Sequence, residues 1–168
     1  DSTFECKLDD PYNWTNCNSP VSYSNLSEGS HSFAVKATDE ANNTGDESVF
    51  NWIIDISGPL PYISSGPNNP TNSDIATFVI ESYDNETTDT LECNLDSAGW
   101  DDCTSPKVYD NLSEDDHSFS VRATDSVGNT GSSVYYNWTT DYTEPVVTIT
   151  SGPDSITNST SANSSFSS

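Results

Sequence analysis

The residues of this chain best suited to chemistry are two histidines and paired acids such as the three Asp–Asp pairs. His31 and His117 each open an alternating segment, which predicts equivalent surface positions at the starts of two strands. The Asp–Asp pairs are Asp9–Asp10, Asp101–Asp102 and Asp115–Asp116. Paired carboxylates can hydrolyse glycosides, but that reaction needs a cleft, and no segment here suggests one. A nucleophilic triad would require the two histidine segments to differ, and they do not. We therefore expect no enzymatic activity.

The chain repeats itself at a spacing of 86 residues. The stretch NLSEGSHSFAVKATDEANNTG from Asn25 returns as NLSEDDHSFSVRATDSVGNTG from Asn111. Further matched pairs are Cys17 and Cys103, Leu26 and Leu112, His31 and His117, Phe33 and Phe119, Asp39 and Asp125, Trp52 and Trp138, and Asp55 and Asp141. Cys6 and Cys93 lie 87 apart, so one residue is inserted nearby. A period of this size indicates tandem compact domains rather than solenoid repeats.

The four cysteines recur as the same local pair in each copy. Four cysteines allow three pairings, and the repeat favours disulfides between Cys6 and Cys17 and between Cys93 and Cys103. The alternative is a metal site, but no Cys-x-x-Cys spacing occurs and the histidines are distant in sequence. Disulfides indicate an oxidising compartment, so we expect an extracellular or cell-surface protein.

The chain contains eight Asn-x-Ser/Thr sequons, which are potential sites for N-linked glycans. They lie at Asn13, Asn25, Asn42, Asn85, Asn111, Asn137, Asn158 and Asn163. Asn25 and Asn111 occupy the same turn in both copies, which strengthens the prediction of glycosylation there. The alternative is that asparagine and serine are simply good turn residues.

Calcium is a further candidate ligand, and no other cofactor is expected. The stretches TDEANNTGDE from Thr38 and DSAGWDD from Asp96 offer several oxygen ligands in loops. Calcium takes six to eight oxygens, and neither stretch has EF-hand spacing. The alternative is that Asp39 and Asp125 only cap Asx-turns.

The composition excludes several partners. The formal net charge is -23, which repels nucleic acid and anionic membranes. No apolar run approaches the roughly 18 residues that cross a bilayer, so we expect no membrane insertion. Hydrophobic residues make up only 32%, which predicts a thin core, but 4 Trp, 8 Tyr and 6 Phe argue against disorder.

The local patterns predict strands throughout. In HSFAVKA, Phe33, Val35 and Ala37 face one way, and the residues between them face the other. The segments SVFNWIID and SVYYNWTTD are rich in β-branched and aromatic residues, and each follows an NTG turn. About seven short strands per repeat fit an all-β fold of tandem immunoglobulin-like β-sandwiches.

The repeated pattern resembles the immunoglobulin-like and fibronectin-III-like repeats of large prokaryotic cell-surface proteins. It comprises Phe4, Glu5, Cys6, Leu8, Asp9, Trp14, Cys17, Ser19, Pro20, Tyr23, Leu26 and His31 onward, and the second copy runs from Leu91, Glu92 and Cys93. The resemblance implies architecture over nearly the whole chain. It says less about function, because such modules serve as spacers, adhesive tips and enzyme appendages.

The two copies are unequal at their opening strands. Two strand-like segments, near PYISSGP and DIATFVIES, precede the first cysteine of the second copy, and the first copy has neither. The segment EPVVTITSGPDSITNSTSANSSFSS resembles such an opening. We therefore expect an incomplete domain at 1–57, a complete domain at 58–143, and opening strands at 144–168 that complete residues 1–57 of a neighbouring copy. The alternative is that the end segments are cropped or poorly ordered.

The predicted function is structural: a glycosylated, disulfide-bonded rod or filament in which copies of the chain join head to tail. Neighbouring repeats could be separate subunits or one continuous polypeptide. The second hypothesis is an adhesin stalk or carbohydrate-binding surface module with Tyr12, Trp14 and Trp100 as contact residues. For the two tryptophans, packing over the disulfides is the alternative.

Overall fold

The computed structural model describes residues 2–83 and 90–168, and strands are the only regular elements in those ranges. They are β1 (Thr3–Leu8), β2 (Thr15–Cys17), β3 (Gly29–Thr38), β4 (Ser48–Ile54), β5 (Leu60–Ser65), β6 (Ala76–Tyr83), β7 (Thr90–Leu95), β8 (Asp101–Cys103), β9 (Lys107–Tyr109), β10 (Asp116–Thr124), β11 (Val134–Thr139), β12 (Thr148–Ser151) and β13 (Ser165–Ser167). Every pairing between these strands is antiparallel. The all-β prediction is confirmed. With no helix in the described ranges, none there could cross a membrane.

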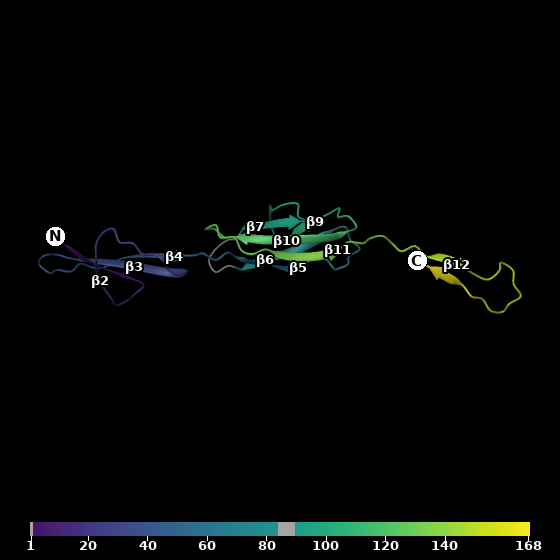
Figure 1. Cartoon of the computed structure of the whole chain (residues 1–168), viewed down its shortest axis with the longest axis horizontal. Helices are drawn as coiled ribbons and strands as arrows, with labels where there is room; N and C mark the ends of the chain where they lie inside the picture. Colours follow the sequence, from purple (N-terminus) through teal and green to yellow (C-terminus); the bar gives the residue numbers. More distant parts are fainter. Residues whose placement is uncertain (1, 84–89) are drawn as a thin grey trace. The chain divides into compact units, whose positions relative to one another are not determined.

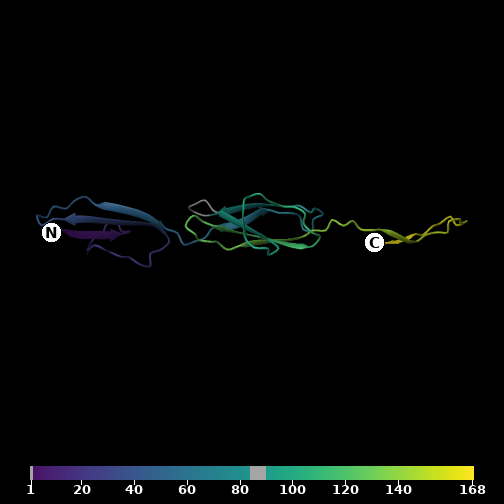
Figure 2. The ribbon, with the colours of Figure 1, turned by 90° about the horizontal axis from the view of Figure 1, so that it is seen from above.

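The central domain is a two-layered sandwich. One sheet has the order β11-β10-β7-β8 and the other β5-β6-β9, and Figure 2 shows the two layers. The core lies between them, where the Phe78 ring stacks on Phe119 at 4.0 Å between centroids and meets Trp138 edge-on. All three side chains are at most 1% exposed. This domain is the immunoglobulin-like sandwich that the sequence predicts.

The alternation along β10 explains why this segment holds the core. Phe119, Val121 and Ala123 are each 0% exposed and share the face that meets β6. In β3, their counterparts Phe33 and Val35 are only half-buried and Ala34 between them is buried, but Phe33 and Val35 line one common groove. The predicted strand and its facing are therefore correct in both copies.

The first sheet repeats one layer of that sandwich. Its order is β2-β1-β3-β4, and the strands correspond in turn to β8, β7, β10 and β11. The registers agree as well, because Cys6 is opposite Val35 and Cys93 is opposite Val121. Figure 1 shows this sheet as a single layer. Of the side chains described between residues 2 and 58, only Cys6, His31 and Ala34 are buried.

The last two strands form a hairpin that copies the pairing of β5 with β6. Ile149 is opposite Phe166, and 86 residues earlier Ile63 is opposite Ile80. Both pairings also contain the same irregularity, between Ile63 and Ser65 and between Ile149 and Ser151. Every residue from 141 to 168 is exposed.

The chain divides into two compact units, residues 1–58 with 127–129, and residues 59–126 with 130–168. The second unit thus groups the hairpin with the central domain. The predicted boundaries at 57/58 and 143/144 fall between strands, and the role given to 144–168 stays a prediction.

Candidate functional site

The inner face of the first sheet is an apolar surface open to solvent. A groove of about 250 Å³ runs along it, lined by Phe4, Cys6, Cys17, Asn18, Ser19, Val21, Phe33 and Val35. Phe4 is 43% exposed and Val21 40% exposed. The disulfide forms part of the groove lining, and aromatic and β-branched side chains form most of the rest. Such a surface is suited to holding an apolar strand.

The same face in the central domain is covered by β6. Phe78 of β6 lies on Phe119, and the backbone N–H of Ile80 donates a hydrogen bond to Ser105 Oγ over 2.8 Å. Ser19 is the counterpart of Ser105, and it lines the open groove of the first sheet. The first sheet thus presents the acceptor for a strand like β6.

One short segment differs between the copies because of that missing layer. β9 pairs with β6 through Ala76 opposite Tyr109 and Phe78 opposite Lys107. The counterpart of β9 is residues 21–23, and it has no strand assignment in this structure. Tyr23 belongs to the repeated sequence pattern, but no strand was predicted at residues 21–23, although the match of Tyr23 to Tyr109 could have indicated one.

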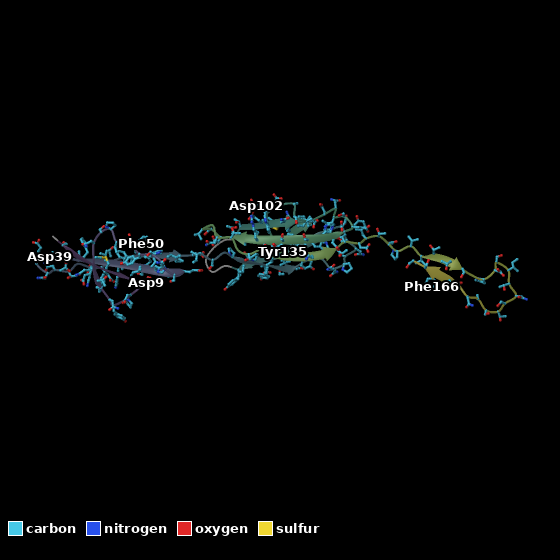
Figure 3. All side chains as sticks on the ribbon, in the orientation of Figure 1. Asp9, Asp39, Phe50, Asp102, Tyr135 and Phe166 are labelled. Atoms are coloured by element: carbon cyan, nitrogen blue, oxygen red, sulfur yellow. A yellow bond between two sulfur atoms is a disulfide. The ribbon has the colours of Figure 1, made fainter. Side chains whose placement is uncertain are left out.

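The hairpin carries apolar side chains of its own in the open. Val147 is 64% exposed, Ile149 73% and Phe166 75%. Ile149 and Phe166 are directly opposite each other across the two strands, so their side chains share one face. Figure 3 labels Phe166 on this hairpin.

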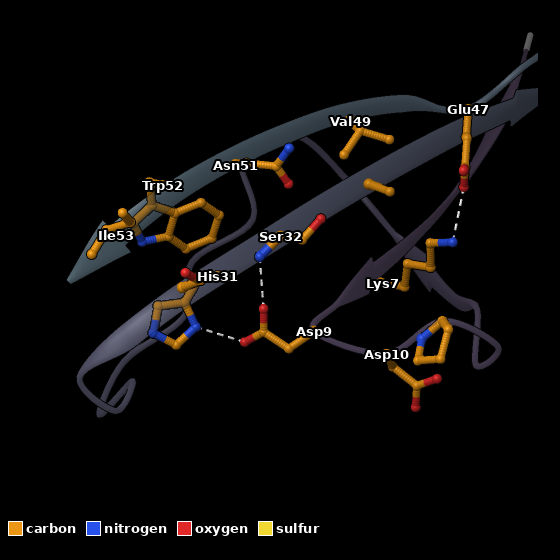
Figure 4. Close-up of a pocket in the computed structure, with 13 residues that line it drawn as sticks. Lys7, Asp9, Asp10, His31, Ser32, Glu47, Val49, Asn51, Trp52 and Ile53 are labelled. Carbon is orange, nitrogen blue, oxygen red and sulfur yellow. Dashed lines mark hydrogen bonds and ion pairs between the residues drawn. The ribbon is translucent and has the colours of Figure 1, made fainter.

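The outer strand of the first sheet is also less covered than its counterpart. In the central domain, Thr139 N–H donates to Asn69 Oδ1 over 3.0 Å, and Thr71 N–H donates to the Thr139 carbonyl over 2.9 Å. The loop after β5 therefore binds the edge of β11. On β4, Phe50 is 67% exposed and Ile53 53% exposed. A cleft adjoins β4, and Figure 4 shows Trp52, His31 and Asp9 in it.

The histidines are buried, so their predicted surface positions were wrong. His31 is 5% exposed and His117 is 6% exposed. Each ring stacks on the tryptophan of the neighbouring strand, His31 on Trp52 and His117 on Trp138. The position at the start of a strand suggested exposure, although two-residue alternation places His31 on the same face as Phe33 and Val35. The tryptophan comes from a different strand, which local alternation does not reveal.

Each histidine links a loop to a strand through two hydrogen bonds. His31 Nδ1 lies 2.7 Å from Asp9 Oδ2, and its Nε2 lies 2.7 Å from the Ser27 carbonyl, as Figure 4 shows in part. Both contacts need a donor, so the protonated ring satisfies both. The hydrogen bond to Asp9 raises the pKa of His31, and the Ser27 carbonyl adds to this shift. The same bond lowers the pKa of Asp9.

His117 repeats this arrangement in the central domain. Its ring nitrogens lie 2.8 Å from Asp96 Oδ2 and 3.0 Å from the Ser113 carbonyl. Burial opposes protonation there, but the hydrogen bonds to Asp96 and Ser113 outweigh it and raise the pKa of His117. Since both copies carry the same contacts, these groups hold turns in place.

The acidic pairs mostly serve turns and strands as well. A hydrogen bond from the side-chain amide of Asn13 lowers the pKa of Asp10, and the backbone N–H groups of Tyr12 and Asn13, which donate to Asp10 Oδ1, add to this shift. Asp101 and Asp102 lie on β8, and Asp115 Oδ1 accepts the N–H of Asp116. Figure 3 labels Asp102.

The aromatic residues proposed as carbohydrate contacts fall into two groups. Lys7 and Lys36 hold their amino groups 4.5 and 4.3 Å from the Trp14 ring centroid, and Arg122 lies 4.6 Å from that of Trp100. Both tryptophans are half-buried. Tyr12 is 84% exposed.

The two disulfides are present as predicted. Cys6 is bonded to Cys17 and Cys93 to Cys103, each with 5.8 Å between the Cα atoms. In both copies the bond joins the strand that carries the first cysteine, β1 or β7, to the short strand that pairs with it, β2 or β8.

The sequons that the structure describes are all exposed. These are Asn13, Asn25, Asn42, Asn111, Asn137, Asn158 and Asn163, while Asn85 lies outside the described residues. Asn25, Asn42 and Asn111 have φ between 55° and 63°. Asparagine tolerates this left-handed region, so turn geometry also accounts for these three residues.

In the candidate calcium loops, Asp39 and Asp96 use their carboxylates for hydrogen bonds within the protein. Asp39 accepts hydrogen bonds from the backbone N–H and the side-chain amide of Asn43, which lowers the pKa of Asp39. Asp96 accepts from Ser118 N–H as well as from His117. Among residues 2–83 and 90–168, no group of three or more His, Cys, Asp or Glu side chains is placed to hold a metal ion.

Comparison with known proteins adds a similarity to solved structures. No protein-family model and no curated protein sequence matches this chain. The chain is similar to a solved structure of the fibronectin(III)-like modules of Clostridium thermocellum CbhA, with 15% identity and a TM-score of 0.43, over 82% of this chain and 77% of that chain. The assignment to the immunoglobulin-like class rests on the strand order and core described above.

Proposed function

We propose that this chain is a structural extracellular protein that forms a rod or filament of immunoglobulin-like domains completed head to tail. In this proposal, the β12–β13 hairpin of one copy covers the open face of the first sheet in the next copy. A contact between two different surfaces of identical molecules is repeated from copy to copy. It produces a linear assembly unless the rotation between successive copies closes a ring.

The observation that carries this proposal is the match between an open face and an exposed hairpin. The first sheet has the strand order and register of one layer of the central sandwich, and the hairpin has the pairing and irregularity of β5 with β6. Covering apolar surface contributes roughly 25 cal/mol for each Å² removed from water. Contact between the open face and the hairpin would remove apolar area of both from water and so lower the free energy of the assembly.

The disulfides support the extracellular part of the proposal. Both bonds close short loops, with sequence separations of 11 and 10 residues. Disulfides persist mainly in oxidising compartments. We also propose that the exposed sequons carry N-linked glycans, which mass spectrometry before and after glycosidase treatment would map residue by residue.

The proposal is tested by comparing the chain with a variant that lacks residues 146–168. We expect the full chain to form concentration-dependent linear oligomers, seen by light scattering and by negative-stain electron microscopy. The shortened variant should remain monomeric under the same conditions. A full chain that stays monomeric at the highest attainable concentration, or a shortened variant that still forms fibres, would contradict the proposal.

A further inference from the structure

We propose that Phe166 of one copy inserts into the groove of the next copy between the Cys6–Cys17 disulfide and Phe33, with Gly152 lying beneath Phe50. This inference rests on the proposed head-to-tail function and specifies the register of the contact. Its occupant is the β12–β13 hairpin of a second copy of this chain.

The register follows from the 86-residue correspondence. The hairpin pairs Ile149 with Phe166 where the central domain pairs Ile63 with Ile80. Phe166 therefore stands in the place of Ile80, and Ser164 in the place of Phe78. A slip of one residue would turn every inward side chain outward, so the register decides which side chains reach the groove.

The surroundings of Ile80 indicate what Phe166 would meet. Ile80 is 3% exposed and packs in the core with Cys93 and Phe119, whose counterparts in the first sheet are Cys6 and Phe33. Both of those counterparts line the open groove. In the hairpin, the small Ser164 replaces the large Phe78 and Phe166 replaces the smaller Ile80. The larger ring at one position thus offsets the smaller side chain at the other.

Backbone pairing supplies a second contact. Ala76 is opposite Tyr109 and Phe78 is opposite Lys107 in the central domain. The same register places Ala162 opposite Tyr23 and Ser164 opposite Val21. Docking would then turn residues 21–23 into a strand like β9, and the N–H of Phe166 would face Ser19 as that of Ile80 faces Ser105.

Gly152 fits the same register. Its counterpart Gly66 lies against a ring, since a Cβ added there would be 3.0 Å from Tyr136 and 3.2 Å from Phe78. A Cβ at Gly152 would have Ser164 Oγ at 3.9 Å as its nearest neighbour, which leaves room for a side chain. Phe50 is the counterpart of Tyr136 and is 67% exposed. In the docked register its ring needs the space that Gly152 leaves.

The test measures the association constant of the full chain by sedimentation equilibrium. Phe166→Ala should weaken association by about a hundredfold or more, as truncation of a buried phenylalanine does. Phe166→Ile, which restores the residue type of the central domain, should stay within about tenfold of the unchanged chain. The matched control is Ser165→Ala, whose side chain points to the opposite face of β13 and should leave association unchanged.

The second pair of variants tests the glycine. Gly152→Val should weaken association by about tenfold or more through a clash with Phe50, whereas Thr150→Val should not, because its counterpart Ser64 is exposed. Hydrogen-exchange mass spectrometry should also show residues 21–23 protected in the assembled chain and unprotected in the variant lacking residues 146–168.

The outcomes separate this inference from the proposed function. If removal of residues 146–168 abolishes assembly but Phe166→Ala and Gly152→Val behave like their controls, the register is wrong and head-to-tail completion stands. If removal of residues 146–168 leaves the oligomeric state unchanged, both fail. A monomer whose residues 21–23 are protected at all concentrations would show a hairpin folded back within one copy, which also contradicts a second copy as occupant.

Discussion

Phe119 and Phe33 occupy the same position in two nearly identical strands, yet one is 0% exposed and the other only half-buried. Trp138 is 1% exposed in the central domain, and its counterpart Trp52 is half-buried. The two copies share strand order and register, so the strands themselves do not cause this difference. The second layer does, because β6 covers the central sheet and the open groove of the first sheet lacks such a cover.

Contacts within one layer are the same in both copies. The histidine–tryptophan stack has a centroid distance of 5.4 Å in the first sheet and 5.2 Å in the central domain. The disulfide and the cation over the tryptophan recur as well. Local contacts therefore form without the second layer, whereas burial of the apolar face depends on it.

The largest expected difference between the two copies is in the stability lost when Phe119 and Phe33 are each replaced by alanine. Both substitutions are made in the chain lacking residues 146–168. Phe119→Ala should lower the free energy of unfolding of the central domain by about 3–5 kcal/mol, because it leaves a cavity under Phe78. Phe33→Ala should cost the first sheet much less, since its ring is half-buried. Hydrogen-exchange mass spectrometry reads the two regions separately. Equal losses would show that the first sheet has a covered core.

Removing the disulfides tests whether local contacts are equivalent. Replacing Cys93 and Cys103 by serine should lower the stability of the central domain by about 2–3 kcal/mol, the value for a short closed loop. Replacing Cys6 and Cys17 should cost about the same but unfold the first sheet altogether, because little burial remains to hold it. Hydrogen-exchange mass spectrometry tests this by comparing the protection of β3 amides with that of β10 amides. Persistent protection of β3 would contradict the expectation.

A smaller effect is expected from the pair of Arg122 and Glu92. Arg122 donates two hydrogen bonds to the Glu92 carboxylate, at 2.7 and 3.0 Å, and this pairing lowers the pKa of Glu92. Arg122→Lys should lose the forked geometry and cost roughly 0.5–1 kcal/mol in urea denaturation. The first sheet has Lys36 and Glu5 at these positions, so Lys36→Arg is the reciprocal change. If Arg122→Lys and Lys36→Arg both lower the free energy of unfolding, the forked geometry of arginine does not explain the stability of the pair.

The smallest expected effect is the pH dependence of the histidine links. The pKa of His117 is raised in the folded chain, so its contribution to stability is complete below the unfolded value of about 6.5 and is lost as pH rises through the folded value. The melting temperature of the central domain should therefore fall between pH 6 and pH 9. His117→Asn should flatten this dependence. A melting temperature that rises over this range would reverse the inferred sign.

Sequence alone predicted the features that depend on neighbours along the chain or on the repeat. The facing of Phe33 and Val35 follows from alternation, and the pairing of Cys93 with Cys103 follows from its recurrence. The burial of His31 was not predicted, because Trp52 reaches it from another strand. Pairing between distant strands is a non-local property that local patterns do not encode.

The candidate site was predicted in outline only. The 86-residue match indicated that residues 144–168 resemble opening strands, but the shared irregularity at Ile149 and Ser151 needed the structure. The groove residue Ser19 and Tyr23 of the segment 21–23 were part of the repeated sequence pattern, but the pattern assigned them no role. Their roles emerge only from the contact of β6 with β9 and Ser105 in the other copy.

All four basic residues of the chain lie over aromatic rings: Lys7 and Lys36 over Trp14, Lys107 over Tyr109, and Arg122 over Trp100. With a net charge of -23, the surface of each copy is strongly anionic. The anionic surfaces of two copies repel each other within a Debye length, which is about 10 Å at 0.1 M salt. Dissolved cations must neutralise this repulsion before copies can lie alongside one another, so bundling should follow ionic strength, while an apolar end-to-end joint should persist in dilute buffer.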